Sequence, residues 1–290
     1  MKRSSLLKRY SDYLTLRNYR PQTVKAYVSS LNKFIDFAII NSSPSNDIFE
    51  YCKSYLTTRF KEGKKWSSVN IDYSALKILV VHVLNKEWDY EMIPRPRGKP
   101  SVPTVLSGRQ IESMINKTSN LKHKTIILLM YSSGIRINEL IQLNNSHLLL
   151  DRKQLKVEKG KGGKDRIVAL PDRAIEILKI YLQIYRPDSI LFRGLKPGRR
   201  YSSSSVAKII DRAAKLANVQ WKVCPHSLRN AYATHHIENG TDLVSLKYQL
   251  GHSNIKTTLK YVKFCKTNHR HIHHPIQKLD IILKSKTTLD

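Results

Sequence analysis

The stretch CPHSLRNAYATHH, residues 224–236, places His226 and Arg229 one helical turn apart. Side chains three residues apart on a helix share a face, so an imidazole and a guanidinium at this spacing can both donate to one anion. Arginine cannot ligate a cation, which argues against a metal site. By itself the pattern leaves three interpretations open: a metal site, a basic structural helix and a phosphate-binding site. The rest of the chain distinguishes them.

The charge of the chain favours a polyanionic partner. Its 290 residues contain 51 Lys and Arg against 22 Asp and Glu, which gives a net charge of +29 and a pI near 10.1. Hydrophobic residues make up 41% of the chain, enough for packed cores. Nucleic acid is the first candidate partner. An anionic lipid surface is the alternative, but the basic residues run through the whole sequence and form no single amphipathic basic helix.

The cysteines and the N-terminus indicate the reducing cytoplasm. Cys52, Cys224 and Cys265 are odd in number, widely spaced and form no CxxC pair, so we expect neither a disulfide framework nor a zinc ribbon. The N-terminal residues start basic but lack the apolar core and cleavage site of a signal peptide. The longest apolar stretches, such as TIILLM (125–130), are too short to span a bilayer. We therefore expect a cytoplasmic protein without membrane contact.

Apolar residues recur at helical spacing through the first ninety-odd residues. The pattern is clear in three segments, 23–39, 46–60 and 67–88. Pro21 and Thr23 mark the start of the first segment, and Ser67 or Ser68 is the expected N-cap of the third. Three or four helices with short connections predict a small bundle.

A proline-rich segment follows the predicted bundle. The stretch IPRPRGKPSVPTVLS, residues 93–107, is too dense in proline to form a helix or a central strand. It predicts an extended basic linker over residues 94–106. Its basic side chains are expected to contact DNA, and they are Arg95, Arg97 and Lys99.

The remainder of the chain predicts a mainly helical α+β fold with a small β-hairpin. The segments 107–118 and 123–134 predict helices, the second of which ends at Gly134. Helical patterns resume at 172–185, 204–217, 227–240 and 242–251. Residues 154–160 and 165–170 alternate in polarity around KGGK and predict the two strands of the hairpin. We expect an N-terminal domain over 1–93, the linker over 94–106, a second domain over 107–268 and a C-terminal tail over 269–290.

Three motifs together resemble the tyrosine recombinases, the phage-integrase superfamily. They are SSGIRINELIQL (132–143), GKGGKDRIVAL (160–170) and HSLRNAYATHHIENGTDLVSLKYQLGHSNIKTTLKYV (226–262). The resemblance covers the catalytic domain from about Leu106 to Val262, and the N-terminal helices fit the family's SAM-like DNA-clamping domain. One departure is Asn230, where the family often has histidine.

The resemblance implies a role for each residue that matches the family's catalytic set. Arg136 and Arg229 would bind the non-bridging phosphate oxygens, because positive donors stabilise the charge that develops there. Lys161 would protonate the departing 5′ oxygen, and Glu139 would orient the site. His226 and His252 would supply hydrogen bonds and proton transfer, and Tyr261 would be the nucleophile.

Other residues compete for two of these roles. Lys159 and Lys164 flank Lys161, and we expect them to contact the DNA backbone. Tyr248 is the alternative nucleophile, but its place between Leu246 and Leu250 predicts that it packs in the interior.

The function that the resemblance implies is site-specific DNA recombination. The enzyme would cut one strand, form a 3′-phosphotyrosyl bond and pass the strand to a partner duplex, without a metal ion, ATP or other cofactor. Its partners would be double-stranded recombination sites and copies of itself, as a dimer on one site and a tetramer in the synapse, with accessory DNA-bending proteins possible. Two alternatives remain: a catalytically inactive recombinase-fold regulator, and a topoisomerase-like enzyme that relaxes DNA.

The residues after the predicted nucleophile suggest a device for assembly. The run HRHIHHP, 269–275, is expected to be a solvated basic stretch rather than a metal site. Pro275 could begin a short helix whose apolar face is formed by Ile276, Leu279, Ile282 and Leu283. Such a helix is unstable in water unless it docks, and we expect it to dock on a neighbouring protomer. Docking on its own domain is the alternative.

Overall fold

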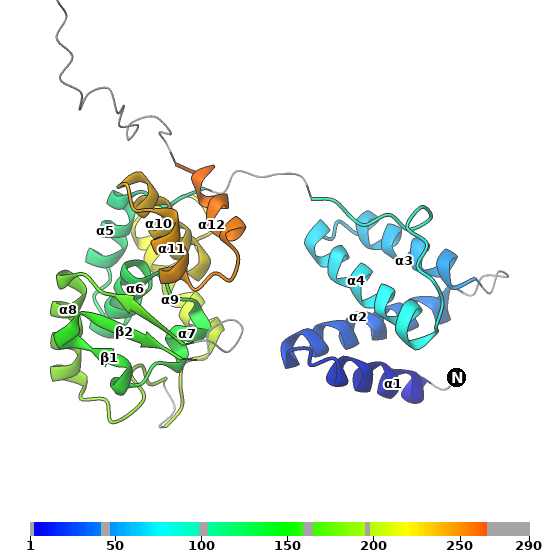
Figure 1. The fold of residues 1–290 in the computed structure, drawn as a ribbon, viewed down its shortest axis with the longest axis horizontal. Coiled ribbons are helices and arrows are strands. Elements are labelled where there is room, and N and C mark those ends of the chain that lie inside the picture. Colours follow the sequence, from blue (N-terminus) through cyan, green and yellow to red (C-terminus); the bar gives the residue numbers. More distant parts are fainter. Residues whose placement is uncertain (1–2, 42–46, 99–103, 159–164, 195–197, 266–290) are drawn as a thin grey trace, which may run out of the picture. The chain divides into compact units, whose positions relative to one another are not determined.

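The computed structural model describes residues 3–41, 47–98, 104–158, 165–194 and 198–265. The chain divides into two compact units, residues 1–101 and 102–290, which Figure 1 colours from blue to cyan and from green to orange. None of the helices in the described ranges is long and apolar enough to cross a membrane.

The first unit is a bundle of helices, as predicted. It consists of α1 (Arg3–Leu16), α2 (Pro21–Ile40), α3 (Ile48–Lys61), α4 (Trp66–Ile78) and a π-helical turn, η1 (Leu79–Val83), that continues α4. The start of α2 at Pro21 is confirmed. The predicted N-cap at Ser67 or Ser68 is wrong, because the chain is already helical at Trp66 and Lys65 is the last extended residue.

A buried carboxylate ties three helices of this bundle together. Asp72 on α4 is 3% exposed and accepts a hydrogen bond from Ser30 on α2. It also accepts a 3.0 Å bond from Arg59 Nε on α3. Because a buried charge without partners is costly, these donors fix the order in which the helices pack.

The start of the predicted linker lies along α4. Arg95 donates to Asn70 Oδ1 at 2.9 Å and lies over the ring of Tyr73, 5.6 Å from its centroid. A Cβ added to Gly98 would lie 2.2 Å from the Trp66 side chain, so the backbone packs directly on the indole. Residues 94–98 form neither helix nor strand, as the prolines predict.

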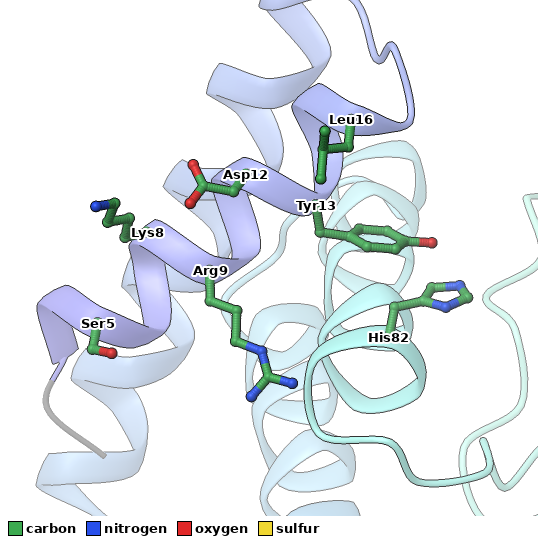
Figure 2. A pocket seen from close by; sticks show the side chains of 7 residues that line it. All are labelled: Ser5, Lys8, Arg9, Asp12, Tyr13, Leu16 and His82. Atoms are coloured by element: carbon green, nitrogen blue, oxygen red, sulfur yellow. The ribbon is translucent and has the colours of Figure 1, made fainter.

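A shallow hollow of about 390 Å³ lies between α1 and η1 (Figure 2). The rings of Tyr13 and His82 stack at its wall, with centroids 4.7 Å apart. Lys8 and Arg9 border the same hollow from α1. The hollow therefore combines two cationic side chains with an aromatic wall.

The second unit is mainly helical with a small antiparallel sheet. Its helices are α5 (Gly108–Asn116), α6 (Leu121–Ser133), α7 (Ile137–Gln142), α8 (Asp172–Tyr185), α9 (Ser203–Leu216), α10 (Pro225–Glu238), α11 (Leu243–Leu250) and α12 (Ile255–Val262). The sheet has the order β1 (Leu148–Leu149), β2 (Gln154–Val157), β3 (Arg166–Ala169), with short 3-10 turns η2 (Asn145–His147) and η3 (Leu150–Arg152) beside it.

Helix α6 forms the centre of this unit. Every residue from Thr125 to Met130 is buried, and the helix packs against α8 and α10. It ends at Gly134, as predicted, in the left-handed conformation with φ +59°. A Cβ at Gly134 would lie 2.4 Å from the ring of Tyr232 on α10, so only glycine allows this close approach. Arg136 follows two residues after this turn.

The predicted hairpin is present. Strands β2 and β3 pair antiparallel, with Leu155 opposite Val168 and Val157 opposite Arg166. Strand β1, which the sequence did not predict, adds two residues to the other edge of β2. The connection between β2 and β3 contains Lys159, Lys161 and Lys164, and all three lie outside the described residues.

Candidate active site

Arg136 is positioned by the start of α7. It is the N-cap residue of that helix, and its backbone N–H donates to Glu139 Oε2 at 2.8 Å. Its guanidinium donates through Nη1 to Glu139 Oε1 at 2.9 Å and through Nη2 to the carbonyl of Gly251 at 3.2 Å. Arg136, from the first of the three motifs, thus contacts the third motif, more than a hundred residues later.

Arg229 lies deeper, on α10, and is 2% exposed. It donates through Nη1 to the Gly134 carbonyl and through Nη2 to the Leu250 carbonyl at 2.6 Å and to His252 Nε2 at 2.9 Å. Burial, followed by the charge of Arg136, lowers the pKa of Arg229 to about 10. At neutral pH the side chain therefore still carries its charge.

His252 follows the C-terminal turn of α11, where Gly251 has φ +63°. Its Nδ1 lies 2.9 Å from Thr258 Oγ1 on α12. Because a guanidinium can only donate, Nε2 accepts from Arg229, and Nδ1 then carries the proton and donates to Thr258. The tautomer of His252 follows from this network.

His226 occupies the first turn of α10, next to Pro225. Burial lowers the pKa of His226 below its ordinary value of 6.5, and the charges of Arg229 and Arg136 lower it further. The imidazole is therefore neutral at pH 7 and can accept a proton.

Tyr261 is held on α12 against this cluster. Its side chain is 5% exposed and packs with Tyr232, Leu246 and Leu250. Its ring is nearly parallel to that of His252, with centroids 6.2 Å apart and planes 12° apart. Helix α12 contacts both α10 and α11, so its position is fixed by the helices that carry Arg229 and precede His252.

Tyr248 does not pack in the interior, and that prediction is wrong. Its side chain is 65% exposed, whereas Leu246 and Leu250 are fully buried. The two leucines are four residues apart and share a face of α11, while a residue midway between them points to the opposite side. Tyr248 is thus turned away from the face of α11 that packs beside Tyr261.

Models of two families match the chain. The phage integrase family matches residues 104–267, and the phage integrase N-terminal SAM-like domain matches residues 6–90. The chain belongs to the phage integrase family. The resemblance inferred from the three motifs is confirmed, as is the mainly helical fold with a SAM-like bundle.

Curated relatives of this integrase span nearly its whole length. A tyrosine recombinase of Thermosipho africanus is 32% identical over 268 residues, which are 89% of this chain and 94% of the relative. Tyrosine recombinase XerA of Pyrococcus horikoshii is 29% identical, covering 96% of this chain and 95% of the relative. The predicted activity, that of a site-specific tyrosine recombinase, is confirmed at this level.

Solved structures share the fold. A crystal structure of XerA recombinase is 27% identical with a TM-score of 0.53, covering 89% of this chain and 93% of that one. A lambda integrase (75–356) dimer bound to a COC′ core site is 19% identical with a TM-score of 0.75, covering 98% of this chain and 100% of that one.

The predicted site residues of the integrase fall into two groups. The structure brings together Arg136, Glu139, His226, Arg229, His252 and Tyr261. Lys161, Lys159, Lys164 and Lys99 lie outside the described residues. Arg97 is exposed, and Arg95 is engaged with α4 as described above.

Sequence reasoning missed two residues of the site. Thr258 accepts a hydrogen bond from His252 Nδ1, and Arg166 on β3 donates to Glu139 and to the carbonyl of Gln249. A signal for Arg166 was present, because strand alternation places it on the same face as Val168, which is buried. A charged residue on the buried face of a strand needs a partner.

Asn230 shows a consequence of the departure from the family's pattern. Its Oδ1 atom is buried and has no hydrogen-bond partner among the described residues. It follows Arg229 in the chain but takes no part in the contacts that hold the guanidinium.

Proposed function

We propose that this integrase breaks one DNA strand with the hydroxyl of Tyr261 and keeps the strand as a 3′-phosphotyrosyl ester. The observation that carries the proposal is a cluster of two arginines and two histidines in which His252 bonds to Arg229 and its ring lies beside that of the buried Tyr261. Each of these groups has a task in phosphoryl transfer without a metal ion.

The arginines hold the phosphate in this proposal. Arg136 and Arg229 donate to the two non-bridging oxygens, where negative charge grows as the phosphorus passes through its transition state. Arg229 is held by neutral acceptors, so its positive charge is not cancelled by the contacts that position it. A planar guanidinium also matches the spacing of two phosphate oxygens.

Strand cleavage exchanges one bond to phosphorus for another and moves two protons. The Tyr261 oxygen attacks phosphorus, the new P–O bond forms, and the bond from phosphorus to the 5′ oxygen breaks. His226, neutral at pH 7, takes the phenol proton. Lys161 gives a proton to the departing 5′ oxygen, a role that rests on the family resemblance. Attack by the 5′-hydroxyl of a partner duplex reverses the chemistry and releases Tyr261.

The DNA partner is a double-stranded recombination site. The excess of 51 basic over 22 acidic residues supports phosphate contacts along much of the chain. The lambda integrase that shares this fold was crystallised as a dimer on its core site, which supports a dimer on one site here.

We propose that residues 1–93 form a DNA-binding domain and that residues 107–268 form the catalytic domain. The DNA contacts of the first domain include Lys8 and Arg9, beside the hollow in Figure 2. The reaction would take place in the cytoplasm.

Substitution of the nucleophile tests the proposal. A nicked duplex that loses its short 5′ fragment after cleavage traps the covalent complex, which a denaturing gel resolves. We expect Tyr261→Phe to bind DNA as the wild type does and to form no adduct. The matched control, Tyr248→Phe, removes an exposed hydroxyl from the adjacent helix and should form the adduct at the wild-type rate. An adduct in Tyr261→Phe would refute the assignment.

A second assay separates the recombinase from its two alternatives. Plasmids that carry two sites are converted into recombinant circles by a recombinase, whereas a topoisomerase-like enzyme relaxes a plasmid without exchanging sites. An inactive regulator binds the sites and does neither. We expect recombinant products that depend on both sites and on Tyr261.

A further inference from the structure

Arg166, at the first position of β3, uses all three nitrogen atoms of its guanidinium inside the protein. Nη1 donates to Glu139 Oε1 at 2.9 Å, and Nη2 donates to Glu139 Oε2 at 2.7 Å. Nε donates to the carbonyl of Gln249 at 3.0 Å. The side chain is 11% exposed, so it is not placed as a surface contact for DNA. Its bonds run to α7 and α11 instead.

The Glu139 carboxylate accepts hydrogen bonds from both Arg166 and Arg136. Both oxygens of Glu139 also accept from Arg136, at 2.9 Å from Nη1 and at 2.8 Å from the backbone N–H. The Glu139 side chain is 7% exposed. A carboxylate with two donors on each oxygen has one available orientation, and two of its four donors come from Arg166.

The bond from Arg166 Nε to the Gln249 carbonyl is one of three arginine–carbonyl hydrogen bonds at the C-terminal end of α11. Three consecutive carbonyls there lack helical donors and are each taken by a different arginine: Gln249 by Arg166, Leu250 by Arg229 and Gly251 by Arg136. Cations are favoured at this end of a helix. A Cβ at Gly251 would lie 3.0 Å from the Arg166 side chain, so the two pack closely. His252 is the next residue in the chain.

We propose that Arg166 is a positioning residue of the recombinase: by fixing the Glu139 carboxylate and the end of α11, it sets the orientation of Arg136 and the position of His252. It touches neither DNA nor the reacting atoms. The proposal rests on the roles given above to Arg136 and His252.

Substitution of Arg166 should slow the chemistry without weakening DNA binding. In Arg166→Ala, Glu139 loses two donors and the guanidinium of Arg136 is no longer fixed. We expect single-turnover cleavage at saturating DNA to fall about 10- to 100-fold, as a small misplacement of a catalytic group does. The dissociation constant for DNA should change by less than about threefold, because Arg166 has no phosphate contact to lose. Arg173→Ala on the exposed surface of α8 removes the same charge and should leave both quantities unchanged.

A conservative variant distinguishes positioning from charge. Arg166→Lys keeps the cation but replaces three fixed donors with a single flexible ammonium, so it cannot grip both carboxylate oxygens and the Gln249 carbonyl together. We expect a folded protein with a cleavage rate between those of Arg166→Ala and the wild type. If Arg166→Lys is folded and cleaves at the wild-type rate, the proposal is wrong. This variant also serves if Arg166→Ala does not fold.

A double-mutant cycle provides the decisive test. If Arg166 acts through Glu139, the loss caused by Arg166→Ala should be much smaller when Glu139→Gln is already present. The same fold-loss in both backgrounds would overturn the proposal, as would wild-type cleavage by Arg166→Ala. Adduct formation by wild type and by Tyr261→Phe is measured on the same substrate. An adduct that persists in Tyr261→Phe refutes the proposed function, whereas additive losses with an intact Tyr261 adduct refute only the role of Arg166.

Discussion

Arg229 carries a positive charge at a buried position, where it is 2% exposed. Its guanidinium donates hydrogen bonds to two carbonyls and an imidazole. Because all three acceptors are neutral, they position the guanidinium without neutralising its charge. Arg136 differs, because it is paired with Glu139 and is 27% exposed. The site thus contains one buried cation, Arg229, and a second, partly exposed cation, Arg136, whose direction is set by a carboxylate.

Loss of either arginine should affect chemistry more than affinity. We expect Arg136→Ala and Arg229→Ala each to slow cleavage about 100-fold or more, as loss of one transition-state donor does. DNA affinity should change far less, because many other basic side chains neutralise phosphates. Single-turnover cleavage and gel-shift titration measure the two quantities, with Arg173→Ala as the control. A loss of affinity as large as the loss of rate would show that these arginines only bind DNA.

Glu139 should make stability depend on pH in acid. Burial by itself raises the pKa of Glu139, but hydrogen bonds from Arg166 and the Arg136 backbone and the two guanidinium charges lower it from 4.5 to about 2. A carboxyl whose pKa is depressed by folding stabilises the protein above its unfolded pKa, and this contribution is lost as the pH falls through the folded value.

The difference in free energy of unfolding between wild type and Glu139→Gln should therefore be largest above about pH 5 and shrink towards pH 2. Urea titrations at a series of pH values measure it. Glu112→Gln, on α5, is the control for loss of an exposed carboxylate in the same unit. A difference that stays constant over this range would contradict the network described for Glu139.

Which residues form the site could be predicted, but which atoms connect them could not. Arg136, Arg229, His252 and Tyr261 lie in motifs that the resemblance to the tyrosine recombinases identifies. The bonds of Arg166 join residues 27 and 83 positions apart, and such distances are set by the tertiary fold. Tyr248 is a different case: Leu246 and Leu250 are buried, but helical periodicity turns the residue midway between them to the exposed face of α11.

Helix α6 and its terminal glycine connect the core to the active site. Gly134 ends the helix, its carbonyl accepts from Arg229, and Arg136 follows two residues later. The ring of Tyr232 packs against the Cα of Gly134. The turn therefore depends both on the left-handed conformation of Gly134 and on this contact. The two arginines proposed to bind the phosphate therefore depend on one glycine position.

Gly134→Ala should destabilise the second unit more than a comparable glycine substitution. A left-handed φ costs an L-residue about 1–2 kcal/mol, and overlap with Tyr232 adds about 1–3 kcal/mol. Gly240→Ala is the matched control, because Gly240 has φ +82° and nothing within 4 Å of an added Cβ. Chemical denaturation gives both losses. Equal losses in the two variants would mean that the Tyr232 contact contributes nothing.

Local signals predicted some elements and missed others. Gly134 and Pro21 marked helix ends correctly, because each fixes a backbone conformation directly. The hairpin followed from alternation over several residues. Strand β1 has two residues, too few for a period to be visible. Ser67 and Ser68 mimicked a cap, but Trp66, which packs on Gly98, is already helical.

After α12, the sequence continues into a C-terminal tail, residues 269–290, that lies outside the described residues. We propose that the tail docks on a neighbouring protomer and makes cleavage depend on assembly. The proposal rests on the apolar spacing of Ile276, Leu279 and Leu283 after Pro275.

Truncation after Pro275 tests the role of the tail. We expect binding to a single half-site to stay within about threefold of wild type, because the basic residues that remain supply the phosphate contacts. Cooperative binding to paired half-sites and strand exchange should be lost. A full-length variant with Leu279→Ser and Leu283→Ser should behave like the truncation. If the truncated chain still assembles cooperatively and recombines at the full rate, the tail does not couple the protomers.

The central claim is that Tyr261 becomes covalently joined to the 3′ phosphate of the cleaved strand. The direct measurement is to trap the wild-type complex on a nicked duplex in the presence of EDTA, digest the protein and identify the DNA-linked residue by mass spectrometry. We predict a single modified residue, Tyr261, carrying the 3′ end of the DNA. A link to any other residue, a link through a 5′ phosphate, or an adduct that forms only when a divalent metal is restored would contradict the account.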